Sequence, residues 1–149
     1  MSITFYTAQQ SIGVVSHIAL EESGLDYELV AVDFSANQQS STEYLKINPK
    51  ARVPSLVLER GILTETPAIL TYIAQQAPES VIALPDDSYE YAQIQSFNSY
   101  LASTVHVAHA HKRRGSRWVE DEGAMQAMSD YVPKSMGACM ALILSLIHI

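Results

Sequence analysis

Strand-like segments are confined to the part of this 149-residue chain before residue 65, and this most limits the folds open to it. Residues 3–6 and 27–32 are short runs of mainly apolar, β-branched or aromatic side chains, as in buried strands. The segment between them has apolar residues at helical spacing and ends at Gly24, a natural helix stop. The order strand, helix, strand predicts a right-handed parallel unit.

An antiparallel hairpin and a closing helix are expected next. Residues 55–58 and 62–64 form two short strand-like runs around a glycine turn. A short helix is expected before them, over residues 42–47. Thr66 can cap the helix that follows, and Pro67 suits its first helical position, where no backbone N–H is needed. The βαβ unit followed by ββα predicts a small α/β sandwich.

The pattern predicts two domains of different class. The α/β domain covers residues 1–80, and a linker with two prolines lies at about residues 77–87. From residue 88 onward no strand pattern occurs, and apolar residues from Ile94 to Ala108 recur as on one face of a long amphipathic helix. Another helix is expected near residue 120. We therefore expect a partial α-helical domain over residues 88–149.

Charge and cysteine content exclude several classes of protein. The net charge of -7 argues against nucleic acid as a partner, because phosphate binding needs a basic surface. The single cysteine, Cys139, excludes an internal disulfide, a multi-thiolate metal site and a C-x-x-C oxidoreductase. Of His106, His109 and His111, the first two could share a helix face, but no third ligand is evident, so no metal is expected. No signal peptide or membrane-length apolar run is seen, which predicts a cytoplasmic protein.

In this order of elements the chain resembles the glutathione S-transferase family, and within it the bacterial, beta-like group. The resemblance rests on Phe5-Tyr6, residues 16–24, the run Asn48-Pro49-Lys50-Ala51-Arg52-Val53-Pro54, Glu65-Thr66 before a helix, and residues 99–106. It implies a thioredoxin-like N-terminal domain followed by an incomplete all-α C-terminal domain. It also implies a homodimer that conjugates the thiolate of its co-substrate glutathione to small electrophiles.

The resemblance also assigns a glutathione site. Val53 precedes a proline, Pro54, that is cis in the family, and its backbone pairs with the cysteinyl part of the peptide as an extra strand would. Glu65 and Thr66 match the acid and hydroxyl that hold the γ-glutamyl end at a helix N-terminus. Arg52 is the candidate cation for the glycyl carboxylate, although an exposed arginine without a role is equally open.

Catalysis requires ionisation of a thiol whose pKa is about 8.5 in the free state. A hydroxyl donor and a helix N-terminus both stabilise a thiolate. The cysteine that the beta-like group often carries near the first helix is absent, and Ser11 is its natural substitute. Tyr6, at the end of the first strand, is the alternative; helix capping and packing are the non-catalytic interpretations of these two residues. His106 matches a histidine that the beta-like group directs at the site from its second domain.

Two further questions stay open at this point. The same fold could serve as a non-catalytic glutathione-binding or protein-interaction module, because fold does not fix function. The segment from Cys139 onward is almost wholly apolar and has no helix stop signal. Residues 144–149 resemble a translated sequencing adapter, so we expect a fragment of a longer protein whose last residues are not native. The rival interpretation is a natural tail that docks on a dimer mate.

Overall fold

The computed structural model describes residues 2–147. The chain divides between Tyr91 and Ala92 into two compact units. The first unit contains all the strands of the described residues, and the second is helical.

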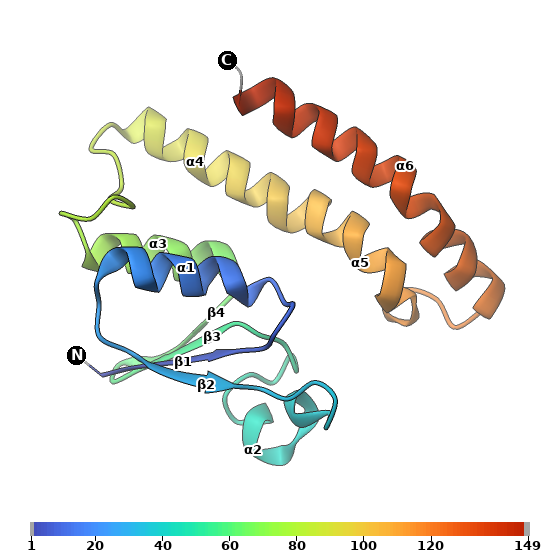
Figure 1. The fold of residues 1–149 in the computed structure, drawn as a ribbon, viewed down its shortest axis with the longest axis horizontal. Coiled ribbons are helices and arrows are strands. Elements are labelled where there is room, and N and C mark those ends of the chain that lie inside the picture. Colours follow the sequence, from blue (N-terminus) through green and yellow to red (C-terminus); the bar gives the residue numbers. More distant parts are fainter. Residues whose placement is uncertain (1, 148–149) are drawn as a thin grey trace. The chain divides into compact units, whose positions relative to one another are not determined.

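The first unit is built on a four-stranded mixed sheet of order β2-β1-β3-β4 (Figure 1). β1 pairs in parallel with β2, whereas the β1–β3 and β3–β4 pairs are antiparallel. The parallel pair is possible because a helix connects the two strands, and the hairpin turns at Gly61. The predicted βαβ-ββα order is confirmed, with bounds as follows: β1 Ile3–Thr7, β2 Glu28–Ala31, β3 Ser55–Leu58 and β4 Gly61–Thr64.

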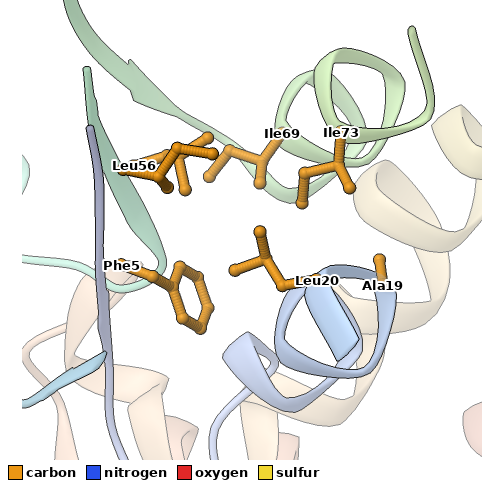
Figure 2. Packing of buried hydrophobic residues seen from close by; sticks show 7 residues of the cluster. Phe5, Ala19, Leu20, Leu56, Ile69 and Ile73 are labelled. Carbon is orange, nitrogen blue, oxygen red and sulfur yellow. The ribbon is translucent and has the colours of Figure 1, made fainter. Parts of the chain in front are cut away.

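Two helices, α1 (Gly13–Ser23) and α3 (Thr66–Gln76), pack together on one face of this sheet (Figure 1). Alternate residues of a strand point to one face and every third or fourth residue of a helix does so, which places a single apolar layer between them. Figure 2 shows this layer. It consists of fully or almost fully buried side chains: Ile3, Phe5, Ala19, Leu20, Leu56, Ile69 and Ile73.

The opposite face of the sheet carries the short helix α2 (Thr42–Leu45) (Figure 1). Its Tyr44 is buried in a second cluster with Ala8, Val32 and Val53. α2 ends two residues before the predicted end at residue 47. The reason is that the chain tightens there: the N–H groups of residues 47 and 48 both donate to the Tyr44 carbonyl.

A buried asparagine holds the loop that leads from α2 to β3. Asn48 is 1% exposed, and its Nδ2 donates to the Arg52 carbonyl at 2.7 Å and to Ser55 Oγ at 3.3 Å. Its Oδ1 accepts the Lys50 N–H at 3.1 Å. The Tyr44 hydroxyl donates to the same Arg52 carbonyl at 2.7 Å. One amide therefore fixes both ends of the loop over residues 49–53.

The second unit consists of two long helical segments, the first of which begins in the last residues of the first unit. α4 (Ser88–Tyr100), the π-helical turn η2 (Leu101–Val105) and α5 (His106–Arg114) form a continuous run that confirms the predicted amphipathic helix. After the short η3 (Gly115–Arg117), α6 (Glu122–Ile147) packs along α5 (Figure 1). Among residues 2–147, no helix is both long and apolar enough to cross a membrane.

The apolar segment from Cys139 continues α6 to Ile147. Cys139 is buried, but Met140, Leu142, Leu144 and Leu146 are each at least 40% exposed. The last two residues of the segment that we expect to be non-native, 148 and 149, lie outside the described residues.

Replacing Asn48 by alanine should lower the free energy of unfolding of the first unit by about 1–3 kcal/mol, because it leaves a buried carbonyl and a backbone N–H without this partner. Denaturant unfolding followed by circular dichroism measures the loss. Gln75→Ala removes an exposed amide from the same unit and should change stability by no more than about 0.5 kcal/mol. Equal effects of the two substitutions would show that Asn48 does not hold the loop.

Candidate functional site

The start of α1 is organised by the Ser11 hydroxyl. Ser11 Oγ accepts the Gly13 N–H at 3.1 Å and donates to the Ala8 carbonyl at 2.7 Å. The prediction that Ser11 occupies the cap position is wrong, because α1 begins at Gly13 and Ile12 precedes it. The serine nevertheless satisfies a backbone donor at the helix start, from one position further upstream. Its only proton is given to Ala8, so a thiolate would receive this hydrogen bond only after the hydroxyl rotates.

A close contact beneath the same helix start admits only glycine at position 13. A Cβ built on Gly13 would lie 2.1 Å from Thr7 Oγ1 and 3.1 Å from Ser11 Oγ. Thr7 ends β1, and its Oγ1 is buried with no hydrogen-bond partner in the part of the chain that the structure describes. The last residue of β1 and the first turn of α1 are therefore in direct contact.

Tyr6 lies on the other face of the sheet. It pairs with Ser55 in the β1–β3 register, and its ring packs edge-on against Tyr44 at a centroid distance of 5.9 Å. Its neighbour Phe5 faces α1 instead, as strand alternation requires. The ring of Tyr6 thus has a packing role in the cluster under α2.

The backbone before β3 is the part of the site that most resembles a peptide-binding edge. The Val53-Pro54 peptide bond is cis, as predicted. Val53 is only 9% exposed, yet within residues 2–147 its backbone N–H and C=O take part in no hydrogen bond. The side chain of Arg52 is exposed, whereas its carbonyl is held inward by Tyr44 and Asn48. Burial raises the pKa of Tyr44, which favours the protonated hydroxyl that donates to this carbonyl.

The start of α3 presents a carboxylate. Glu65, not the predicted Thr66, occupies the cap position, and Thr66, not the predicted Pro67, is the first helical residue. Glu65 has φ 73°, a conformation that a residue with a side chain seldom adopts and that tends to mark functional positions. Its Oε1 accepts a hydrogen bond from Lys50 Nζ, which also donates to Thr64 Oγ1 at 2.8 Å.

The remaining candidate, His106, belongs to the second unit. It is the first residue of α5, directly after the π-helical turn, a kind of irregularity that is frequent at functional sites.

His111, on the same helix, packs edge-on against Trp118 at a ring-centroid distance of 4.6 Å. In residues 2–147, no group of three or more His, Cys, Asp or Glu side chains is placed to hold a metal ion.

Sequence reasoning missed two features of this region. The Lys50–Glu65 pair joins residues 15 positions apart on different elements, and no periodicity predicts such a contact. The contact of Thr7 with Gly13 was also missed, although a glycine in the first turn of a predicted helix is a usable signal of close approach.

The fold of the first unit defines the class of the protein. A mixed sheet of order β2-β1-β3-β4, with α1 and α3 on one face and α2 on the other, is a thioredoxin-like domain. The family described as "Glutathione S-transferase, N-terminal domain" matches residues 1–75. The chain belongs to the glutathione S-transferase family.

Solved structures agree with this assignment over nearly the whole chain. A glutathione transferase homolog from Sulfitobacter, with bound glutathione, is 46% identical with a TM-score of 0.91; the match covers 95% of this chain and 68% of that one. A bacterial beta class glutathione S-transferase from Sphingomonas chungbukensis is 32% identical with a TM-score of 0.74, and the match covers 91% and 67% of the two chains. The predicted resemblance to the bacterial, beta-like group is confirmed.

Among curated proteins, glutathione S-transferase GstA of Escherichia coli O157:H7 is 36% identical over 95 residues, which are 62% of this chain and 47% of GstA. The chain spans about half the length of curated relatives such as GstA and glutathione S-transferase GST-4.5 of Xanthomonas campestris pv. campestris.

Gly13→Ala should destabilise the protein by about 1–3 kcal/mol, because the new Cβ overlaps the Thr7 hydroxyl. In a Thr7→Ala background the same substitution should cost less, since the overlapping oxygen is gone. Thermal or denaturant unfolding of the four proteins in this cycle measures the coupling. Gly137→Ala is the matched control: its Cβ meets nothing within 4 Å in α6, so helix propensity should stabilise it slightly. Additive effects of the Thr7 and Gly13 changes would contradict the contact.

Proposed function

We propose that this protein is a glutathione transferase, which activates the glutathione thiol and conjugates it to small electrophiles. One observation supports this most directly: the backbone of Val53, which makes no hydrogen bond within residues 2–147, lies just before β3, and β4 leads directly into the carboxylate of Glu65 at the start of α3. A backbone edge and a charged helix start are what an extended peptide with a γ-glutamyl end requires. Membership of the family and the glutathione-bound Sulfitobacter homolog are consistent with this function.

In the proposed complex each part of glutathione has a partner. The cysteinyl backbone pairs with Val53 N–H and C=O, with Pro54 shaping the loop. The γ-glutamyl ammonium pairs with Glu65, and its carboxylate meets Thr66 and the N–H groups of the first turn of α3. Arg52, whose side chain is exposed beside the loop, is the candidate for the glycyl carboxylate.

Ser11 is the proposed donor to the thiolate, and Tyr6 is the alternative. Ser11 stands at the positive end of α1, where both its hydroxyl and the helix dipole favour an anion. Its hydrogen bond to Ala8 must be exchanged for one to sulfur, which is favourable as the sulfur gains negative charge. Tyr6 is placed second because its ring packs against Tyr44 beneath the opposite face of the sheet.

The second domain completes the proposal. Following the resemblance, we assign residues 1–80 to the glutathione-binding domain and residues 88–149 to the helical domain, and we keep His106 as a candidate that rests on the resemblance alone. We further propose a cytoplasmic homodimer. The alternative, a glutathione-binding module without catalysis, differs in one measurable respect, since it would bind glutathione without turning over any electrophile.

Reduced glutathione should bind this protein and raise its melting temperature, and Glu65→Ala should weaken that binding roughly tenfold to hundredfold, as loss of a hydrogen bond to a charged group does. Isothermal titration calorimetry measures the change. Glu79→Ala removes another exposed glutamate from the same unit and should leave the affinity unaltered. Unchanged affinity in the Glu65 variant would contradict the γ-glutamyl assignment.

Ser11→Ala should reduce turnover of a generic aromatic electrophile by roughly tenfold to hundredfold while changing glutathione affinity much less, because the hydroxyl bond strengthens as the thiolate forms. Steady-state kinetics and the ultraviolet absorbance of the bound thiolate are the two measurements. If Tyr6→Phe shows the larger loss, the donor role passes to Tyr6. If neither variant loses turnover, both assignments are wrong.

A further inference from the structure

Glu65, whose carboxylate is the proposed partner of the γ-glutamyl ammonium, already has a cation beside it, the side chain of Lys50. Lys50 Nζ donates to Glu65 Oε1 and to Thr64 Oγ1, and an ammonium has three N–H donors. One donor of Lys50 and the second oxygen of Glu65 take part in no other hydrogen bond within residues 2–147. The two side chains are 42% and 61% exposed, so a ligand can reach both.

The position of this lysine is fixed by its surroundings. Its backbone N–H is held by the buried Asn48, and its ammonium is held between the end of β4 and the start of α3. A lysine in open solvent would lose more side-chain entropy on binding a ligand than one already held at its tip. Lys50 thus offers a charge that is largely preorganised beside Glu65.

The α-amino-acid end of a γ-glutamyl peptide has the complementary pattern of charge. Its ammonium and its carboxylate are attached to the same carbon atom, so they reach two neighbouring opposite charges on the protein at once. The first turn of α3 adds backbone N–H groups and the positive end of its dipole near the same place. Lys50 and Glu65 form an ion pair that complements this zwitterion: the lysine ammonium can pair with the ligand's carboxylate while the glutamate carboxylate pairs with the ligand's ammonium.

We propose that Lys50 is a further glutathione-binding residue, which binds the γ-glutamyl α-carboxylate while Glu65 binds the α-ammonium. The assignment rests on the proposed function and deepens it, because it names the chemical group that the site selects. Binding retains the Lys50–Glu65 pair and adds the ligand's two charges to it. A peptide that lacks either charge leaves Lys50 or Glu65 without its ligand partner. The pair therefore favours binding of γ-glutamyl thiols that carry both charges.

The test compares three peptides by isothermal titration calorimetry. Glutathione carries both charges, glutaryl-cysteinylglycine lacks the α-ammonium, and γ-aminobutyryl-cysteinylglycine lacks the α-carboxylate. Each is titrated into the full chain and into Lys50→Met, Lys50→Arg and Lys46→Met. Lys46→Met is the matched control, because Lys46 is an exposed lysine four positions upstream of Lys50, at the end of α2.

Lys50→Met should weaken glutathione and glutaryl-cysteinylglycine by about tenfold each, as expected for a partly exposed charge-assisted hydrogen bond. It should leave γ-aminobutyryl-cysteinylglycine equal or tighter, since that peptide offers Lys50 no carboxylate. Lys50→Arg should recover most of the glutathione affinity, and Lys46→Met should match the unaltered protein.

Two results would overturn the assignment. If Lys50→Met binds glutathione as tightly as the unaltered protein or more tightly, Lys50 only competes with the ligand for Glu65. If it weakens all three peptides equally, the substitution acts on the loop and not on the carboxylate. Failure of the unaltered protein to bind glutathione at all would instead refute the proposed function, and the role of Lys50 would fall with it.

Discussion

The hydrogen bonds of one buried amide, Asn48, determine where the proposed binding surface lies. Its Nδ2 and Oδ1 reach the carbonyl of Arg52 and the N–H of Lys50, so both ends of the loop before β3 are fixed from within. A buried amide left without partners is costly, and for this reason the loop has few alternatives. With the Arg52 carbonyl turned inward, the backbone of Val53 is left for a ligand and the side chain of Lys50 reaches Glu65.

The rest of the site follows from where helices begin. α1 and α3 start after β1 and β4, and their first turns supply backbone donors and a positive dipole. At α1 the available groups are already engaged, since Ser11 bonds Ala8 and Gly13 while Thr7 presses on Gly13. At α3 they are less engaged, and an exposed carboxylate stands at the cap. In the proposed function α3 therefore serves mainly to bind glutathione, and α1 serves mainly to stabilise the thiolate at the expense of the Ser11–Ala8 hydrogen bond.

Local patterns predicted the elements well and the helix starts less well. Short runs of apolar, β-branched or aromatic residues located all four strands of the described residues, and helical spacing located the long helices, because burial selects such side chains and sets the period of a helix face. The cap positions were misassigned at both Ser11 and Thr66. Serine and threonine are favoured at caps in general, but the cap is decided by where the chain leaves its strand. Here the chain leaves the strand through a residue with positive φ, Gln10 before α1 and Glu65 before α3. Neither residue type favours positive φ, so the sequence does not indicate these positions.

The sequence by itself determined the order of strands and helices, the change from α/β to all-α composition, and the motif around Val53-Pro54 that indicated the family. These depend on neighbours in the chain, or on a pattern whose spacing is set by local geometry. Only the tertiary structure decided that Tyr6 faces Tyr44 and not α1, that Thr7 admits only glycine at position 13, and that Lys50 meets Glu65. Such contacts join residues that the sheet register and the helix crossings bring together, and no local period encodes them.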